Sequence, residues 1–356
     1  MDTNTPNWQS LISEIVSSPG VAMVVGGVDT GKTRFCLELC MAGFEAGLPT
    51  ALVDADVGQS EVGAPGTIGL AMVDRQVELL SQLKPKRLYF VGATTPADHV
   101  LECAIGTKKM VDAALSLGAR LVVVDTTGLI GGWLGRKLKT CKTDLVRPDY
   151  LIGIERKHEI EHILIPFSRV ASMKVRRVAA SDQAKRKPAE FRAARRRSNY
   201  YKHFADSHGH LIRLDDVSLW NTWLGTGKPM KWQYMKFIED ALKCPVLHVE
   251  VTGRGLFIVS ERPCSMNNRK ELEEQFKTAN ITSITGETFR NVLVGLADEN
   301  ANTINVGLLQ AIDFKHRYLF VISPIKTVSP VRIVQFGSLR VTKEGEELGT
   351  IKPGEM

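Results

Sequence analysis

Residues 21–33, VAMVVGGVDTGKT, indicate the fold more strongly than any other part of the sequence. The first five residues are an apolar, β-branched run that predicts a buried strand. The next eight residues, Gly26 to Thr33, match the pattern G-x-x-x-x-G-K-[ST], and a helical pattern follows from Lys32 to about Ala46. In a strand, loop and helix of this kind, backbone N–H groups and the helix N-terminus surround a phosphate group. We therefore expect a phosphate-binding loop, because a chance glycine-rich turn would not have matching flanks.

Within this loop, Lys32 is expected to reach the β- and γ-phosphates of a nucleotide, and Thr33 to ligate Mg²⁺. The sequence thus predicts ATP or GTP as a cofactor, together with Mg²⁺. The residues expected to contact the nucleotide are Gly26, Gly27, Val28, Asp29, Thr30, Gly31, Lys32, Thr33 and Arg34.

Similar apolar runs follow along the first half of the chain. Strands are predicted at residues 50–56, 87–92, 120–128 and 149–154, and helices at residues 8–17 and 96–117. Strands that are apolar without alternation, and that are separated by helices, are typical of a parallel sheet covered by helices on both faces. The predicted fold class is therefore α/β, of the P-loop NTPase type.

The pattern of apolar residues changes in the last third of the chain. From about Pro245, short apolar runs alternate with turn-forming residues, and one helical stretch lies near residues 268–278. A length of 356 residues also favours two domains over one. We predict an N-terminal helix at 1–20, a P-loop kinase domain at 21–235 and a smaller β-rich C-terminal domain at 236–356.

Composition limits the class of protein. Hydrophobic residues make up 44% and charged residues 24%, as in ordinary globular chains. No apolar stretch is long enough for a membrane span, and the N-terminus lacks the pattern of a secretory signal, so we expect a cytoplasmic protein, or a nuclear one in a eukaryote, with no membrane partner. The six cysteines include no CxxC pair, and we expect buried, reduced thiols rather than a zinc site or a disulfide framework.

Positive charge is concentrated in one segment. Between Lys174 and Lys202 there are eleven lysines and arginines but only two acids, whereas the whole chain has a net charge of +7. Such a concentration favours contact with a polyanion. The segment also carries the aromatic residues Phe191, Tyr200, Tyr201 and Phe204. These could stack on unpaired bases or pack against the domain, and we predict a basic lid near residues 174–204.

Acidic residues follow the second predicted strand in the sequence DADVGQ, residues 54–59. The carboxyl edge of an open α/β sheet is where ligands bind. Phosphoryl transfer needs a group that holds the metal shell and a group that accepts the proton of the attacking hydroxyl. We assign Asp56 as the base and Asp54 as support for the metal. Asp125, at the ordinary Walker B position, is a competitor for the metal role, and Asp54 could instead cap the following turn.

The motifs GGVDTGKT, DADVGQSEVGAPGT, YFVGATTP, DTTG and RPDYLIGI occur in this order. In this combination the chain resembles the polynucleotide 5′-hydroxyl kinases, which include the kinase subunit of the mRNA 3′-end cleavage machinery and the pre-ribosomal RNA processing kinases. It looks closest to their short archaeal and bacterial-type members. The resemblance covers residues 8 to about 215, and the tail is similar to the β domain of the pre-rRNA branch.

The resemblance implies a nucleic acid 5′-hydroxyl as acceptor, RNA more than DNA, and RNA-processing partner proteins. By motif it gives Asp56 the activation of the hydroxyl, Gln59 the orientation of the site, and Thr95 and Pro96 the clasp on the acceptor end. The lid arginines fall between Lys185 and Phe204. Of these we choose Arg192 and Arg196, which share a helix face.

A base contact is also implied near the turn T-x-G. Many members of the family have a tryptophan directly after this turn, where this chain has Leu129. Thr127 in the turn and Trp133, four positions beyond Leu129, complete the predicted substrate-binding set.

Three other functions compete with the kinase. One is a scaffold that binds nucleotide without turnover in an RNA-processing complex, and another is a GTPase or metallochaperone-type ATPase, although the guanine-specific N-K-x-D motif is absent. The third is a zinc peptidase, since residues 158–162 match H-E-x-x-H. We reject it because both histidines are expected to face solvent and no third ligand follows nearby.

Overall fold

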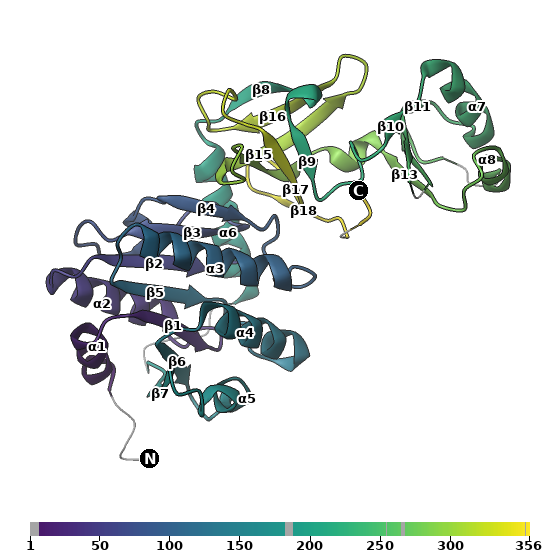
Figure 1. The fold of residues 1–356 in the computed structure, drawn as a ribbon. Helices are drawn as coiled ribbons and strands as arrows, with labels where there is room; N and C mark the ends of the chain where they lie inside the picture. The colour runs from purple at the N-terminus through teal and green to yellow at the C-terminus, as the bar shows by residue number, and fades with distance from the viewer. Residues whose placement is uncertain (1–6, 182–187, 254, 265–267, 353) are drawn as a thin grey trace. The chain divides into compact units, whose positions relative to one another are not determined.

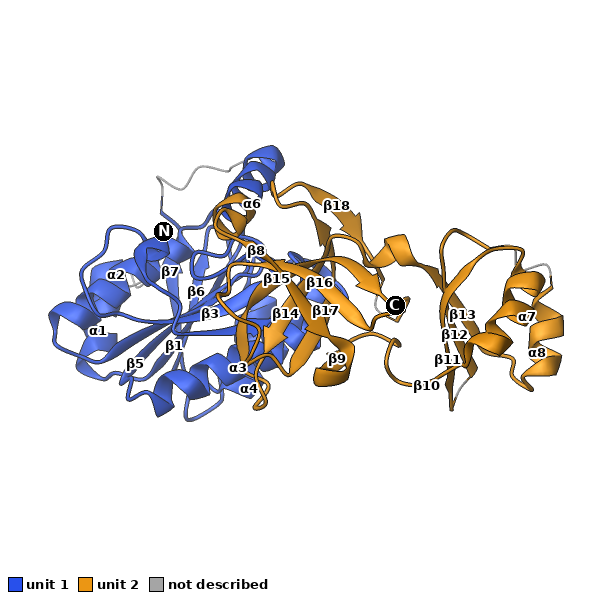
Figure 2. Ribbon diagram, turned by 90° about the horizontal axis from the view of Figure 1, so that it is seen from above, with its two compact units in different colours: residues 1–199 blue, residues 200–356 orange. Residues whose placement is uncertain are grey.

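The computed structural model describes residues 7–181, 188–253, 255–264, 268–352 and 354–356 (Figure 1). The chain divides into two compact units, Met1–Asn199 and Tyr200–Met356 (Figure 2). The boundary predicted between residues 235 and 236 lies inside the second unit. Residues 182–187 of the predicted lid, and 1–6 of the predicted N-terminal segment, fall outside the described residues.

The first unit contributes seven neighbouring sheet strands in the order β4-β3-β2-β5-β1-β6-β7. Its strands are β1 (Val21–Gly26), β2 (Thr50–Ala55), β3 (Thr67–Met72), β4 (Arg87–Phe90), β5 (Leu121–Thr126), β6 (Tyr150–Glu155) and β7 (Lys174–Ala179). Five of these strands, β2, β5, β1, β6 and β7, run parallel to one another. Of these, β1, β2, β5 and β6 are buried along their whole length. This agrees with the predicted parallel core.

Two hydrophobic cores cover the two faces of this sheet. One contains side chains of α3 (Val100–Ser116), α4 (Gly132–Val146) and α5 (Glu161–Leu164). The other contains side chains of α1 (Trp8–Ser17) and α2 (Lys32–Glu45). Successive residues of a strand alternate between the two cores, for example Met23 in the first and Val24 in the second. The P-loop NTPase fold class is therefore confirmed.

The expectation of an all-parallel sheet is wrong at one side. β3 pairs antiparallel with β2, and β4 pairs antiparallel with β3. The sequence reading also missed β3 altogether. The physical reason is the connection between β2 and β3, which is a loop at residues 56–66 without a crossover helix. A chain that leaves a strand through such a loop and returns to its neighbour must reverse direction.

The second unit is β-rich, as predicted. Strands β8 (His208–Arg213), β16 (Tyr318–Ser323), β15 (Thr303–Asp313), β14 (Val292–Ala297), β17 (Ile333–Val341) and β18 (Glu347–Thr350) pair antiparallel in this order, and β9 (Ser218–Trp220) pairs parallel with β17. A smaller sheet consists of β10 (Lys228–Pro229), β11 (Val246–Thr252), β12 (Gly255–Ser260) and β13 (Ile281–Thr285), beside helices α7 (Trp232–Leu242) and α8 (Arg269–Gln275). Helix α6 (Ala189–Phe204) crosses the boundary between the units.

The cysteines do not all behave as predicted. Cys36, Cys40 and Cys103 are buried thiols and Cys141 is partly buried, but Cys244 and Cys264 form a disulfide with their Cα atoms 5.7 Å apart. The prediction of reduced thiols is wrong for this pair. Sequence spacing could not reveal it, because the two residues meet only where α7 and the end of β12 pack together. Among the described helices, none is long and apolar enough to cross a membrane.

Candidate active site at the carboxyl edge of the first sheet

Two side chains of the glycine-rich loop between β1 and α2 donate hydrogen bonds to a carbonyl of the same loop. Lys32 donates a hydrogen bond from Nζ to the carbonyl of Gly27 at 2.7 Å, and Thr30 donates to the same carbonyl at 3.1 Å. Gly31 caps the helix with φ of 96°, a left-handed conformation that favours glycine. At Gly26, an added Cβ would lie 2.4 Å from the carbonyl of Ile154. The loop conformation therefore depends on glycine at both positions.

The remaining residues of the predicted nucleotide set lie around this loop. Asp29 has a positive φ of 55°, and Val28 is exposed. Arg34 points along the surface of α2, where it forms an ion pair with Glu38 at 2.7 Å. The backbone of the loop, together with Lys32 and Thr33, thus remains the candidate cradle for phosphate groups.

Thr33 and Asp125 lie together at the ends of α2 and β5. The Thr33 hydroxyl donates to Oδ2 of Asp125 at 2.7 Å. Oδ1 of Asp125 is buried and has no hydrogen-bond partner among the described residues. Burial raises the pKa of Asp125 to about 6, although Lys32 and the Thr33 hydroxyl oppose the rise. A buried carboxylate oxygen without a partner, beside a hydroxyl oxygen, fits the ligands that Mg²⁺ prefers.

Asp54 is the Cα neighbour of Asp125 across β2 and β5, but its oxygens contact the loop after β2. They accept hydrogen bonds from Asp56 N at 3.1 Å, Glu61 N at 2.5 Å, Val62 N at 2.9 Å and Ser60 Oγ at 3.2 Å. Burial, with a contribution from Asp125, raises the pKa of Asp54 to about 8. Asp54 thus organises residues 56–62, as in the turn-capping alternative, and its support of a metal stays a prediction.

Asp56 begins this loop and is only partly buried. Its Oδ1 accepts the backbone N–H groups of Gly58 and Gln59, both at 3.1 Å. Asp56 follows β2 and Lys32 follows β1, and both strands are neighbours of β5, which carries Asp125. The predicted base, the P-loop lysine and the Walker B aspartate therefore lie at one edge of the sheet, where the charges of Asp56 and Lys32 act on Asp125. Gln59 donates from Nε2 to the carbonyls of Gly58 at 2.7 Å and Arg192 at 3.3 Å.

The predicted acceptor residues come from two further loops. The segment before α3 lies against the loop of Asp56, since an added Cβ on Gly58 would be 2.8 Å from the carbonyl of Thr94. In that segment Thr95 is exposed and Pro96 is buried. After β5, Thr127 is buried, whereas Trp133 at the start of α4 is 74% exposed.

Helix α6 carries the predicted lid arginines. Arg192 has Nη1 4.0 Å from Oδ2 of Asp29 in the glycine-rich loop, and Arg195 forms an ion pair with Glu61 in the acidic loop. Arg196 is half-buried. The helix therefore extends from the phosphate-binding loop to the loop of Asp56. Of its aromatic residues, Tyr200 and Phe204 are buried, whereas Phe191 and Tyr201 are exposed.

Sequence reasoning missed three cations at this site. Lys139 and Lys142 of α4 are fully buried beside the aspartates, and Arg156 donates from Nη2 to the carbonyl of Asp29. No pattern marks them, because lysine and arginine on a helix or in a loop are usually exposed. Only Arg156 had a signal in the sequence, its place directly after the predicted strand at residues 149–154.

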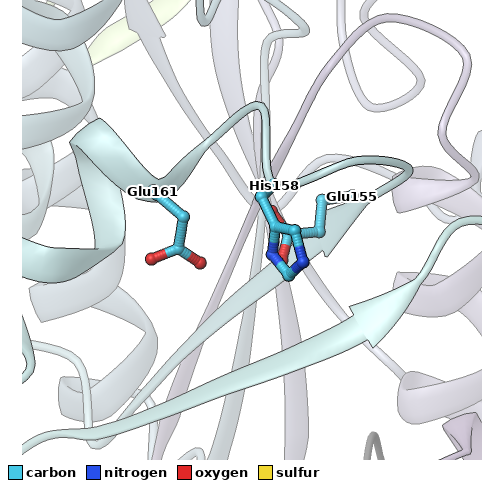
Figure 3. A group of neighbouring side chains, drawn as sticks. All are labelled: Glu155, His158 and Glu161. Atoms are coloured by element: carbon cyan, nitrogen blue, oxygen red, sulfur yellow. The ribbon is translucent and has the colours of Figure 1, made fainter. Parts of the chain in front are cut away.

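The H-E-x-x-H segment does not form a peptidase site. His158 lies before α5 with a φ of 58°, and His162 Nε2 is 2.9 Å from the carbonyl of Ile130. Glu155, His158 and Glu161 are neighbours (Figure 3), and one ligand atom from each lies within 4.8 Å of the others. Arg177 donates to both oxygens of Glu161 at 2.6 and 2.8 Å. This arginine already supplies a cation to the cluster.

Comparison with known proteins identifies the relatives of this chain. Residues 26–206 match the family model of the mRNA cleavage and polyadenylation factor CLP1 P-loop. The polyribonucleotide 5′-hydroxyl-kinase of Thermococcus kodakarensis is 34% identical over 97% of this chain and 95% of its own length. The enzyme of the same name from Pyrococcus horikoshii is 31% identical over 97% and 93%, respectively.

Among solved structures, Clp1p in its complex with a Pcf11p fragment has the same fold. The TM-score is 0.59 with 15% identity, and the match covers 93% of this chain and 77% of Clp1p. At this identity the similarity concerns the fold alone.

Proposed function

The chain belongs to the polyribonucleotide 5′-hydroxyl-kinase family with a CLP1-type P-loop domain, and from this premise we propose how its residues perform the reaction. It is a kinase that transfers the γ-phosphate of ATP to the 5′-hydroxyl end of RNA. The observation that carries the assignment of residues is the cluster of Lys32, Asp125 and Asp56 at one edge of the sheet.

The nucleotide is bound by the loop from Gly26 to Thr33. The hydrogen bond between Lys32 Nζ and the Gly27 carbonyl is exchanged for contacts with the β- and γ-phosphates, where a positive charge stabilises the transferring group. Arg192, held beside Asp29, and Arg196 contribute further positive charge from α6. Arginine side chains in this position stabilise the charge that develops on the phosphoryl oxygens.

Asp56 is the general base. The 5′-oxygen of the RNA forms a bond to the γ-phosphorus, the bond from that phosphorus to the bridging oxygen of ADP breaks, and the hydroxyl proton passes to a carboxylate oxygen of Asp56. The N–H groups of Gly58 and Gln59 hold Oδ1 of Asp56. This contact fixes the carboxylate before the acceptor binds.

Thr33 and Asp125 are the residues that would hold Mg²⁺, because their oxygen atoms already lie together and one of them has no partner among the described residues. When bound, the metal neutralises charge on the β- and γ-phosphates. Asp54, on the neighbouring strand, supports Thr33 and Asp125 indirectly, because its carboxyl group accepts hydrogen bonds from the loop that follows β2.

The acceptor end is bound by Gln59, Thr95, Pro96, Thr127 and Trp133. Of these, Trp133 offers an exposed aromatic face on which a terminal base can stack. The preference for RNA over DNA rests on the names of the relatives. A cytoplasmic location, and protein partners in RNA processing, stay predictions.

The experiment measures transfer directly. The protein is incubated with Mg²⁺, γ-labelled ATP and matched 5′-hydroxyl RNA and DNA oligonucleotides, beside the variants Lys32→Ala and Asp56→Ala. We expect label on RNA with the unchanged protein and on neither oligonucleotide with either variant. Consumption of ATP without labelled oligonucleotide would contradict the kinase assignment, and ATP binding without any consumption would favour the scaffold alternative.

A further inference from the structure

Helix α4 buries two lysines, which the mechanism above does not use. Lys139 and Lys142 are both 0% exposed, whereas Arg136 and Lys137 of the same helix are exposed. Residues three apart on a helix lie on one face, and here that face packs under the carboxyl edge of the sheet. Burying an ammonium group is costly unless it is paired and hydrogen-bonded, so the contacts of the two groups indicate what they do.

Lys139 holds the segment that follows Asp125. Its Nζ donates to Thr126 Oγ1 at 2.7 Å and also donates to the carbonyl of Thr127. The Thr126 hydroxyl in turn donates to the carbonyl of Val24 in β1 at 2.7 Å. Through this chain of hydrogen bonds, Lys139 connects the end of β5 to the strand that leads into the phosphate-binding loop.

Lys142 holds the segment that carries the proposed base. Its Nζ donates to the carbonyl of Ala55 at 3.1 Å. The carbonyl of Ala55 belongs to the peptide that joins Ala55 to Asp56, so this bond fixes the backbone from which the Asp56 side chain projects. Lys142 therefore contacts the backbone directly beside Asp56, and Lys139 contacts the two residues that follow Asp125.

The charges of the two lysines match those of the site. Burial lowers the pKa of Lys142, and the negative charges of Asp56, Asp54 and Asp125 oppose this effect. Lys139 also has its pKa lowered by burial and by Lys142, with opposition from Asp56 and Asp125. The negative charges of the aspartates thus favour the protonated form of both lysines, against the effect of burial.

We propose that Lys139 and Lys142 are positioning residues for phosphoryl transfer. Lys142 holds Asp56 in place through the carbonyl of Ala55, and Lys139 holds Asp125 in place through Thr126 and Thr127. This inference rests on the proposed function, since it assigns the two lysines to the reaction that Asp56 and Asp125 perform. Neither lysine contacts the reacting atoms.

The test compares Lys142→Met and Lys139→Met, which keep the length of the side chain, with Lys137→Met as the exposed control on the same helix. Misplacing a catalytic group by about 1 Å costs about 100-fold in rate. We expect the transfer rate in a single turnover to fall about 30-fold or more in both buried variants. Lys137→Met should have an unchanged affinity for ATP and an unchanged transfer rate. Lys142→Gln retains an N–H donor for Ala55 and should recover part of the lost rate.

A second measurement keeps this inference separate from the kinase assignment. Amide hydrogen exchange should increase in residues 56–62 for Lys142→Met and in residues 126–131 for Lys139→Met. If the unchanged protein fails to label RNA, the proposed function is wrong, but the exchange data still test the positioning role. Exchange equal to that of Lys137→Met in both segments would overturn the inference. Transfer rates equal to that of Lys137→Met, in a protein that labels RNA, would overturn it as well.

Discussion

Asp54 and Asp125 occupy equivalent positions on neighbouring strands, yet their environments give them different roles. Asp54 accepts four hydrogen bonds from residues 56–62, whereas Asp125 accepts one from Thr33 and keeps an oxygen without a partner among the described residues. The first arrangement holds a loop and the second leaves an atom available to a metal. Residue type alone does not distinguish the two aspartates.

The raised pKa of Asp54 predicts a pH-dependent stability. Because burial raises it from 3.8 to about 8, protonated Asp54 stabilises the folded state fully below pH 3.8. That contribution is lost as the pH rises toward 8, by up to about 1.4 kcal/mol per pH unit. Asp54→Asn cannot ionise, so its deficit in unfolding free energy relative to the unchanged protein should shrink between pH 5 and pH 8.

Denaturant unfolding at several pH values measures this difference. Asp74→Asn is the control, because Asp74 is exposed and lies two residues after the end of β3. A deficit of Asp54→Asn that stays constant over this pH range would show that Asp54 does not change its protonation there.

Arg192 and Arg197 provide a matched pair of residues on α6. Arg192 lies 4.0 Å from Asp29 of the glycine-rich loop, whereas Arg197 is exposed. We expect Arg192→Ala to lower kcat for transfer by about 10³-fold, as for arginines that stabilise a transferring phosphoryl group. Arg197→Ala should leave kcat within a small factor of the unchanged protein. Equal effects of the two substitutions in steady-state assays would exclude the specific role of Arg192.

Motifs locate residues whose chemistry is tied to spacing. Lys32 and Thr33 were predictable because the glycine-rich loop requires them at fixed positions, and Asp125 because it ends an apolar strand. The disposition of Lys139 and Lys142 was not predictable. Their burial depends on how α4 packs against strands more than ten residues away in sequence, and a lysine in a helix ordinarily indicates a solvated face.

At the scale of elements, two loops meet where the acceptor is expected to bind. An added Cβ on Gly58 would lie 2.8 Å from the carbonyl of Thr94, so Gly58→Ala must push the loop of Asp56 away from the loop of Thr95 and Pro96. We expect Gly58→Ala to lower kcat/KM for the RNA about tenfold or more, since such a shift displaces the base.

The affinity of Gly58→Ala for ATP should not change, because the glycine-rich loop is a separate segment. Titration with a fluorescent ATP analogue provides this control. A variant with normal kinetics toward RNA would show that the contact between the two loops is not needed for transfer.

The order of elements was predictable where the strands are apolar throughout. The apolar runs of β1, β2, β5 and β6 are confirmed to within a few residues, because strands covered on both faces need apolar side chains throughout. β3 and the reversal of the chain direction in β3 were not predictable. The small residues of β3, Gly69 and Ala71, lack the β-branched signal, and strand direction depends on a loop whose path the sequence does not specify.

At the scale of the whole molecule, the disulfide and the proposed site lie in different units. Cys244 and Cys264 close a loop of 20 residues in the second unit, which stabilises the folded state by about 3 kcal/mol in the chain-entropy account. We expect reductant to lower the denaturant midpoint of that unit while the transfer rate in native conditions stays unchanged.

The variant Cys244→Ser should unfold at the lowered midpoint with or without reductant. An unchanged midpoint for the natural sequence on reduction would show that the pair does not form a disulfide in solution. A loss of transfer on reduction would contradict the assignment of catalysis to the first unit.

We propose that Asp56 accepts the proton from an RNA 5′-hydroxyl while the nucleotide is bound after β1. Single-turnover transfer of labelled phosphate from ATP to a 5′-hydroxyl RNA by Asp56→Asn tests it most directly, with Asp74→Asn as control and ATP affinity measured in parallel. We expect Asp56→Asn to transfer phosphate about 10²-fold more slowly or worse, since this is the typical contribution of a general base, and to bind ATP with normal affinity. A rate within about threefold of that of the unchanged protein would contradict this role, because such a difference corresponds to a change in barrier height on the order of RT.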